Sequence, residues 1–396
     1  MDFETLIIGA GAAGMMCAAH AGPGVLVVDH AKAPGEKIRI SGGGRCNFTN
    51  LHASPQNFIS QNKHFCKSAL GRYTQWDFIE LVDQYGIAWH EKTLGQLFCD
   101  NSAKDIIAML RAEMDKAGAQ LWLQTDVGKI AHDGSTFTVA LTREGRTRTV
   151  TARNLVVACG GKSIPKMGAT GLGYQIAEQF GLPVITPRPG LVPLTFSDDK
   201  FKPLAGVAIP ARVSAGNTSF DEAILFTHRG LSGPAVLQAS SYWHEGETIR
   251  VNLVASSDLL ADLQHQRQSE GRKALTTALS QHLPGRLVDH IRTELALDGN
   301  IADQSDAKLT ALCDALADWT LRPAGSEGYR TAEVTLGGVD TDALSSKTME
   351  AKRVAGLFFI GECVDVTGWL GGYNFQWAWS SGWASGKAIA DRQAGS

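Results

Sequence analysis

Three glycines near the start of the chain have the spacing of a nucleotide-binding turn. They follow the apolar run 6–8, which predicts a buried strand, and they precede the small residues of a predicted helix. In a Gly-x-Gly-x-x-Gly turn the first glycine permits the sharp bend, the second lets the backbone approach a pyrophosphate, and the third lets the helix pack on the strand. The phosphates then lie at the helix N-terminus, where N–H groups are free. The predicted contacts of this turn are Gly9, Gly11, Ala12, Ala13 and Gly14.

An acidic residue follows the second predicted strand. The apolar run 25–28 ends in Asp29, twenty residues after Gly9. At this place in a dinucleotide-binding unit, an acidic side chain accepts hydrogen bonds from the hydroxyl groups of the adenosine ribose. It favours a free ribose over one that carries a 2′-phosphate. The unit is therefore predicted to bind a dinucleotide, and NAD and FAD both fit this part of the pattern.

Residues 32–50 are too polar and too rich in glycine to be core, and they predict a long functional loop. The glycines 42–44 and the charges of Arg39 and Arg45 offer backbone N–H groups and cations to a pyrophosphate or a flavin edge. A lowered thiol pKa beside Arg45 would make Cys46 redox-active. No second cysteine lies nearby, so a small loop residue near the cofactor is the favoured interpretation. The predicted cofactor contacts of the loop are Lys37, Ser41, Gly43, Gly44, Arg45, Cys46 and Asn47.

Composition limits the classes of function. The 396 residues predict two or three domains, and 44% hydrophobic residues are typical of a globular protein. A net charge of −3 gives no basic footprint, so no nucleic-acid partner is expected. No apolar run has the length of a membrane span or of a signal core, which predicts a cytoplasmic protein without a membrane partner. The seven cysteines are scattered and indicate neither a disulfide framework nor a metal site.

Changes in hydrophobic period predict the domain organisation. Helices are expected at 76–85 and 104–117, and alternating segments between 121 and 152 predict a small antiparallel sheet. Three prolines between 187 and 193 mark a boundary. The predicted parts are a discontinuous nucleotide-binding domain at 1–190 and 353–396, a β-rich domain at 191–257 and 321–352, and a helical subdomain at 258–320.

Three stretches of the chain resemble one family. Residues 35–50, 226–235 and 356–382 are similar to the signatures of the BaiN-like, or aminoacetone-oxidase-like, family of bacterial FAD-dependent oxidoreductases. The resemblance covers essentially the whole chain. It implies FAD as the tightly held cofactor. It also implies an α/β fold, with a Rossmann-like FAD-binding domain of the glutathione-reductase-like class that carries an inserted β-rich domain and a small helical subdomain.

The resemblance implies further site residues. Val127 falls where related flavoproteins hold the adenine with backbone atoms, and a Gly-Gly pair after the strand 154–159 lets the chain pass the cofactor. Glu362 stands where most such proteins carry Asp. Helical spacing, independently of the resemblance, predicts a place in the core or at an interface for Trp377, Trp379 and Trp383. The additional predicted cofactor contacts are Val127, Gly160, Gly161, Gly361, Glu362, Gly371, Gly372, Tyr373 and Asn374.

A helix that begins at residues 371–374 is expected to direct its N-terminus at the flavin and to stabilise the reduced form. The double glycine is then explained by close approach of the flavin ring. The candidate catalytic residues are His228, Arg229 and Tyr373.

The expected function is hydride transfer between flavin N5 and a small organic substrate or NAD(P)H. NAD(P)H, if used, is expected to bind transiently, because the glycines 168–173 lack the strand that a second fingerprint requires. Three alternatives remain open at this point: an oxidase of small amines, an RNA-modifying or RNA-binding flavoprotein, and a flavin-carrying regulatory or structural protein without turnover. The sequence leaves the oligomeric state undetermined.

Overall fold

The computed structural model describes residues 2–255 and 257–395. The chain divides into two compact units. Unit 1 comprises Met1–Arg188 and Val334–Ser396, and unit 2 comprises Pro189–Glu333. The sequence placed the return to the first unit at 353, whereas the structure places it at Val334. The reason is that strand β19 (Val334–Val339) pairs with β11 (Val184–Gly190), so residues 334–352 pack with the first unit.

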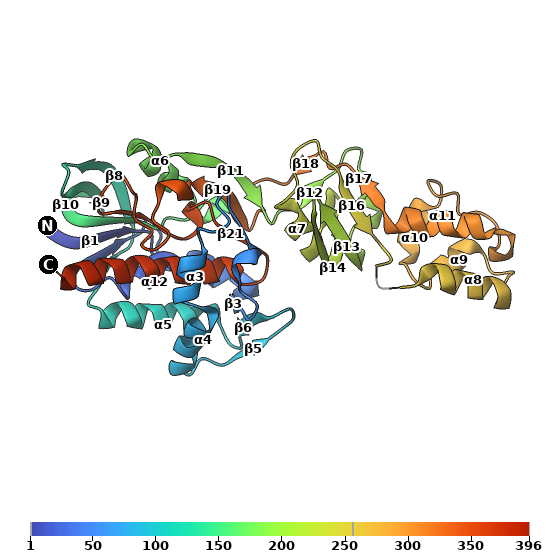
Figure 1. Cartoon of the computed structure of the whole chain (residues 1–396), viewed down its shortest axis with the longest axis horizontal. Helices are drawn as coiled ribbons and strands as arrows, with labels where there is room; N and C mark the ends of the chain where they lie inside the picture. Colours follow the sequence, from blue (N-terminus) through green and yellow to red (C-terminus); the bar gives the residue numbers. More distant parts are fainter. Residues whose placement is uncertain (1, 256, 396) are drawn as a thin grey trace. The chain divides into compact units, whose positions relative to one another are not determined.

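A parallel sheet forms the centre of unit 1 (Figure 1). Strand β1 (Asp2–Ile8) lies between β2 (Val25–Val28) and the C-terminal half of β10 (Arg146–Val157). Strand β7 (Gln120–Trp122) continues the sheet beyond β2, and β20 (Leu357–Phe359) pairs with β10. All four residues of β2 and all three of β20 are buried, as expected of parallel strands that are covered on both faces.

The antiparallel segment joins this sheet. Strands β8 (Thr125–His132) and β9 (Phe137–Arg143) pair antiparallel with each other, and β9 pairs with the first half of β10. The sequence had divided β10 into an antiparallel strand and a separate buried strand. The structure has one strand of twelve residues, because no glycine or proline interrupts 146–157. One sheet of seven strands therefore results.

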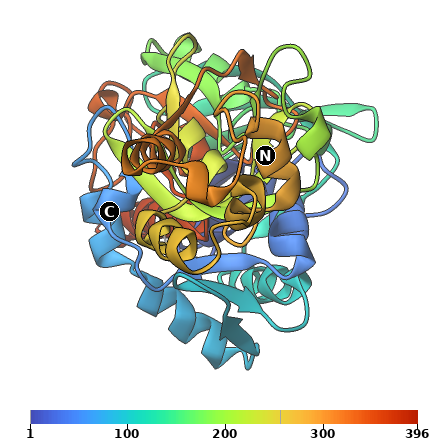
Figure 2. The ribbon, with the colours of Figure 1, turned by 90° about the vertical axis from the view of Figure 1, so that its right-hand side faces the viewer.

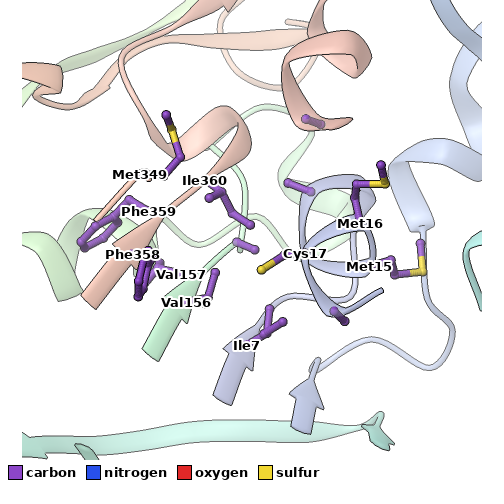
Figure 3. Close-up of a cluster of buried hydrophobic side chains, with 14 of the residues drawn as sticks. Ile7, Met15, Met16, Cys17, Val156, Val157, Met349, Phe358, Phe359 and Ile360 are labelled. Atoms are coloured by element: carbon purple, nitrogen blue, oxygen red, sulfur yellow. The ribbon is translucent and has the colours of Figure 1, made fainter. Parts of the chain in front are cut away.

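Helices α1 (Ala12–Ala18) and α12 (Tyr373–Ala394) pack closely against each other. A Cβ added at Gly382 would lie 2.5 Å from the Ala13 carbonyl oxygen, and one added at Gly386 would lie 2.7 Å from that of Cys17. Figure 3 shows the core between α1 and the strands β10 and β20, with Cys17, Val157 and Phe358 among its side chains. Trp377 and Trp379 are fully buried in the core, as predicted, whereas Trp383 is partly buried and packs against the core.

The other elements of unit 1 surround this framework. Expected helices appear as α4 (Gln75–Gln84) and α5 (Ala103–Lys116). The remaining elements are α2 (Glu36–Ile40), β3 (Asn47–Asn50), β4 (Phe58–Ile59), α3 (Lys67–Arg72), β5 (Trp89–Glu91), β6 (Gln96–Cys99), α6 (Leu172–Gln179) and β21 (Thr367–Gly368), with 3₁₀ helices at Ser41–Gly44, Pro55–Asn57, Pro165–Met167, Thr341–Ala343 and Gly361–Cys363.

Unit 2 contains a second sheet and a group of short helices. The sheet order is β17-β16-β13-β14-β15-β12-β18, and α7 packs on β13 and β14. Their bounds are β12 (Leu194–Thr195), β13 (Ala208–Ala215), β14 (Thr218–Phe226), β15 (Gly230–Ser232), α7 (Pro234–Ser240), β16 (Ile249–Asn252), β17 (Trp319–Leu321) and β18 (Gly325–Ser326), with a 3₁₀ helix at Lys202–Leu204.

The helices of unit 2 fall in the expected 258–320 segment. They are α8 (Leu259–Ser269), α9 (Leu275–Leu279), α10 (Gly285–Ile291) and α11 (Asp306–Ala317), with a 3₁₀ helix at Ile301–Asp303. Figure 2 shows these helices in yellow and orange. Trp319 falls within the segment 258–320 that was expected to be helical, and it instead lies in β17, which pairs with β16. Within the described residues, no helix is both long enough and apolar enough to cross a membrane.

Candidate functional site

Two of the three fingerprint glycines are required by the chain itself. Gly9 has φ +112°, and a Cβ there would lie 2.4 Å from the carbonyl oxygen of Ala158. A Cβ on Gly14 would lie 1.9 Å from the carbonyl oxygen of Gly9. No side chain fits at either position, because both neighbours are backbone atoms. The turn between β1 and α1 therefore has the close strand–helix packing that the sequence predicted.

Gly11 is different from both. Its φ of −85° suits any residue, and no heavy atom lies within 4 Å of a Cβ placed there. Gly11 is the N-cap of α1 without a side-chain cap, and the first helical bond runs from the Met15 N–H to the Gly11 carbonyl oxygen. The N–H groups of residues 12–14, in the first turn, have no acceptor within the helix. Open space beside free donors fits a pyrophosphate, so this turn fits the ADP part of FAD.

Asp29 lies at the end of β2 and contacts the fingerprint turn. Its Oδ2 accepts a hydrogen bond from the Ala10 N–H at 2.7 Å, and its Oδ1 accepts one from the Ala31 N–H at 2.8 Å. The Asp29 carbonyl oxygen accepts from the N–H of Thr125, the first residue of β8. This bond brings β8, which contains Val127, beside the same turn. Asp29 therefore contacts both the fingerprint turn and the first residue of the strand that contains Val127.

A partly buried ion pair joins four separate segments of unit 1. Lys37 of α2 donates from Nζ to Glu362 Oε2 at 2.7 Å and to Ser163 Oγ at 2.8 Å. Ser163 Oγ in turn donates to Glu362 Oε1 at 2.8 Å, and the Thr335 N–H donates to the same oxygen at 2.9 Å. The Glu362 side chain is 20% exposed. These bonds hold α2 against the segments that follow β10 and β20.

The environment keeps Glu362 charged. Burial acts to raise the pKa of its carboxyl group, but the charge of Lys37 and the hydrogen bonds from Lys37, Ser163 and Thr335 outweigh burial and lower the pKa. The cluster also explains Gly161, where a Cβ would lie 2.4 Å from Thr335 Oγ1 and 2.9 Å from Glu362 Oε1. The Thr335 hydroxyl accepts from the Lys162 and Ser163 N–H groups.

Gly361, next to Glu362 in the chain, packs against helix α1, which follows the fingerprint turn. It has φ +69°, and a Cβ there would lie 2.9 Å from the Ala13 Cβ. Its N–H donates to Ser381 Oγ, and its carbonyl oxygen accepts from the Trp377 indole N–H at 3.0 Å. Gly160, with φ +73°, lies near the Glu362 carboxylate. The residues predicted after β10 and after β20 are thus brought together around the start of α1.

The loop after α2 has an unusual backbone. Gly42, Gly43 and Gly44 all have left-handed φ, from +56° to +87°, and a Cβ on Gly43 would meet no atom within 4 Å. Ser41 Oγ donates to the Ile38 carbonyl oxygen, and Arg45 is exposed. The loop therefore presents open glycine backbone and one cation, as a site for an anionic ligand requires.

Cys46 is inert in this structure. It is fully buried, it has φ +50°, and burial raises the pKa of its thiol. A thiol with a raised pKa is not a thiolate at neutral pH, and the thiolate is the reactive form. The structure agrees with the interpretation of Cys46 as a small residue of the loop.

The start of α12 is held by the chain's own atoms. Gly372, the N-cap, has φ +96°, and a Cβ there would lie 2.3 Å from the Thr49 carbonyl oxygen. Gly371 has φ +110°, and a Cβ there would lie 2.9 Å from Cγ of Gln96. Asn374 Nδ2 donates to the Gly368 and Trp369 carbonyl oxygens. The double glycine was attributed to a flavin ring, whereas packing within the protein accounts for both positions.

The three catalytic candidates lie in different surroundings. Tyr373 is 7% exposed, and its ring meets those of Phe58 and Trp369 edge-on. His228 and Arg229 are exposed in the turn between β14 and β15, where the Thr227 N–H donates to the Gly230 carbonyl oxygen. The two residues belong to unit 2, and Tyr373 belongs to unit 1.

Sequence reasoning missed several residues of the site. Ser163 and Thr335 complete the contacts of Glu362, and Asn50 Nδ2 donates to the Gly371 carbonyl oxygen at 2.8 Å. The sequence signal that could have identified Asn50 is its place within the stretch 35–50, which resembles the family signature. Thr335 lies in an apolar strand whose pattern indicates only burial.

Comparison with known proteins gives a consistent assignment. Residues 3–388 match the family described as "HI0933-like protein Rossmann domain". A ribosomal RNA dihydrouridine synthase of Escherichia coli (strain K12) is 55% identical over 394 residues, which covers 96% of each chain. A ribosomal RNA dihydrouridine synthase of Haemophilus influenzae is 49% identical and covers 98% of each. A 3-dehydro-bile acid delta(4,6)-reductase of Clostridium scindens is 27% identical, again over 98% of each.

Two solved structures of low sequence identity share this fold. A 3-ketosteroid-delta4-(5alpha)-dehydrogenase from Rhodococcus jostii RHA1 has a TM-score of 0.52 at 13% identity and covers 98% of this chain and 97% of its own. A 3-ketosteroid delta1-dehydrogenase from Sterolibacterium denitrificans has a TM-score of 0.51 at 14% identity and covers 99% and 100%. At such identity the likeness shows the fold alone. The chain belongs to the HI0933-like family of FAD-binding Rossmann proteins, and it is a FAD-dependent oxidoreductase.

Proposed function

We propose that this flavoprotein reduces uridine to dihydrouridine in ribosomal RNA. The observation that supports this most directly is that two relatives with that name are 55% and 49% identical over almost the full length of both chains. The more distant relative is named as a reductase of a 3-dehydro-bile acid at the 4 and 6 positions. Uracil and such a compound share a carbon–carbon double bond conjugated to a carbonyl group. The proposal replaces the expected small organic substrate with a base of RNA.

We assign the cofactor contacts as follows. Gly11 and the first turn of α1 hold the pyrophosphate, Asp29 holds the ribose, and backbone atoms near Val127 hold the adenine. The glycine loop after α2, the Lys37–Glu362 cluster and the start of α12 surround the rest of FAD. The full proposed set is Gly9, Gly11, Ala12, Ala13, Gly14, Asp29, Lys37, Ser41, Gly43, Gly44, Arg45, Cys46, Asn47, Val127, Gly160, Gly161, Gly361, Glu362, Gly371, Gly372, Tyr373 and Asn374.

Saturation of the C5–C6 double bond of uracil consumes one hydride and one proton. Bound FAD, once reduced, supplies the hydride. His228, Arg229 and Tyr373 remain the proposed candidates for substrate binding and proton transfer. NAD(P)H is the proposed donor that reduces the flavin, and it binds transiently. The glycines before α6 are the place where a second dinucleotide fingerprint would lie, but neighbouring side chains fill the space beside them. A Cβ on Gly171 would lie 2.9 Å from Lys162 Cε, and a Cβ on Gly173 would lie 3.1 Å from Cys159 Sγ.

A local basic surface supports an RNA partner despite the net charge of −3. Arg143, Arg146 and Arg148 are all exposed near the tip of the β9–β10 hairpin, where Glu144 forms an ion pair with Arg143 at 3.9 Å. The register pairs Arg143 with Arg146 and Leu141 with Arg148, so the three arginines lie on one face of the hairpin. Arginines on one face suit the phosphates of RNA. Ribosomal RNA as the substrate would place the protein in the cytoplasm.

The test combines cells and purified protein. Deletion of the gene should remove dihydrouridine from ribosomal RNA, as measured by mass spectrometry of digested nucleosides. Purified FAD-loaded protein with NADPH should restore it in RNA from the deletion strain, while the Gly11→Val variant should not. Unchanged dihydrouridine in the deletion strain would overturn the proposal. Turnover of small enones or amines without RNA would instead favour the small-molecule alternatives.

A further inference from the structure

One exposed leucine lies at the edge of the proposed flavin site. Leu94 is in the turn between β5 and β6, and its side chain is 56% exposed. The exposed large apolar side chains of the described chain are Ile40, Trp76 and Leu94. Leu94 also has φ +50°, in the left-handed region that a bulky residue rarely adopts. Exposure to water and a left-handed backbone are both energetically unfavourable for a leucine, so the stability of the fold does not explain why Leu94 is present.

Hydrogen bonds fix this turn against the start of α12. Asn50 Nδ2 donates both to the Leu94 carbonyl oxygen at 3.1 Å and to the Gly371 carbonyl oxygen at 2.8 Å. The Gly95 N–H donates to Glu91 Oε1 at 3.0 Å, and the Gly95 carbonyl oxygen accepts from the Leu51 N–H at 2.8 Å. The turn is therefore held rigidly beside the double glycine that we assign to the flavin site.

The next residue, Gln96, contacts the double glycine directly. A Cβ on Gly371 would lie 3.0 Å from both Cδ and Nε2 of Gln96. The carboxamide has one bond in the described part of the chain, a long one of 3.4 Å from Asn47 Nδ2. Rotating the Asn47 amide gives Asn47 better contacts with Thr49, Leu97 and Gly372, and it releases Gln96. The donor and acceptor of Gln96 are then available to a ligand.

We propose that the turn formed by residues 92–96 binds the target uridine. The Gln96 carboxamide accepts from uracil N3–H and donates to O4, and Leu94 fills the space that the base leaves in its stack. This inference rests on the proposed function and on the flavin ring lying near Gly371. A base must leave its stack to reach an enzyme site, and proteins insert apolar side chains between stacked bases. A carboxamide offers one donor and one acceptor side by side, which matches that edge of uracil.

Two substitutions separate recognition from folding. Leu94→Gly removes the side chain and relieves the left-handed strain, so the Tm should stay within about 3 °C of wild type or rise. Gln96→Leu keeps the bulk and removes the hydrogen bonds. Each should keep its FAD and its reduction by NADPH. Each should lower kcat/KM for dihydrouridine formation in ribosomal RNA by about tenfold to a hundredfold, the usual effect of losing one specific base contact. Trp76→Ala, at the 59% exposed Trp76 of α4, is the matched control and should change kcat/KM less than about twofold.

A binding measurement tests the base preference. Short RNA with a single uridine should perturb the flavin absorbance of the wild-type holoenzyme more strongly than the same RNA with cytidine, and Gln96→Leu should remove that difference. If the wild-type holoenzyme forms no dihydrouridine, the proposed function fails and this inference fails with it. If the wild type is active and both variants match Trp76→Ala, the function stands and this inference is overturned. Loss of FAD or a lower Tm in both variants would also overturn it, because the turn would then be structural.

Discussion

Two helices of unit 1 begin at glycine, and the surroundings of the two glycines are opposite. Gly11, before α1, has an ordinary φ of −85° and no atom within 4 Å of a Cβ. Gly372, before α12, has φ +96° and would place a Cβ 2.3 Å from the Thr49 carbonyl oxygen. The protein itself therefore requires glycine at 372 but not at 11. The open space at Gly11 leaves room for a ligand to approach the helix N-terminus, which is where we propose that the pyrophosphate of FAD binds.

The largest effect on FAD binding is expected at Gly11, where no protein atom fills the space beside the backbone. Gly11→Val should abolish FAD binding, because the branched side chain occupies the space assigned to the pyrophosphate. The apoprotein should lose less than about 1 kcal/mol of unfolding free energy, since the new side chain meets no protein atom. Isothermal titration with FAD and urea unfolding of the apoprotein measure the two quantities. Retention of FAD by a folded Gly11→Val variant would show that the pyrophosphate does not bind beside Gly11.

At Gly372, where the protein leaves no room for a side chain, a substitution should affect stability more than FAD binding. Gly372→Ala should lower the free energy of unfolding by about 2 to 4 kcal/mol, from left-handed strain and the clash with Thr49. Apoprotein and FAD-loaded protein should lose similar amounts, as measured by urea unfolding. An unchanged stability together with a lower flavin midpoint potential would instead support the helix-terminus role that the sequence suggested.

A substitution at Glu362 tests the ion pair with Lys37, which joins segments that are distant in sequence. Glu362→Gln removes the ion pair with Lys37 and should cost about 1.5 to 3 kcal/mol at pH 7. The folded pKa of Glu362 lies below its ordinary value of 4.5, so the stabilisation is present above that pH and is lost as the pH falls through the folded pKa. Urea unfolding should therefore show the difference between the two proteins shrinking below pH 4.5. A constant difference would show that Glu362 does not act through its charge.

Local patterns predicted the parts of the fold whose determinants are local. The turn after β1, the two helices α4 and α5, and the buried strand before Gly361 all follow from hydrophobic period and glycine spacing. The domain return at Val334 was missed because it depends on the pairing of β19 with β11, whose residues are distant in sequence. The single strand β10 was missed because both halves look like separate short strands.

The same distinction holds for the candidate site. The sequence named Lys37 and Glu362 but not their contact, which joins residues 325 positions apart. Glycine spacing at 371 and 372 could not reveal that Thr49 and Gln96 fill the space, because that depends on tertiary packing. The function of individual site residues stays a prediction until FAD and RNA binding are measured.

The smallest effect is expected at Cys46, the signature residue whose side chain the protein encloses completely. Burial raises the pKa of its thiol, and it is fully buried beside an exposed Arg45. Native protein should therefore leave Cys46 unlabelled by iodoacetamide at pH 7, as peptide mass spectrometry can show. Cys46→Ala should keep the flavin and change turnover less than about threefold, at a stability cost of about 1 kcal/mol. Rapid labelling of Cys46, or loss of turnover in a folded and FAD-loaded alanine variant, would instead place this thiol in the redox chemistry.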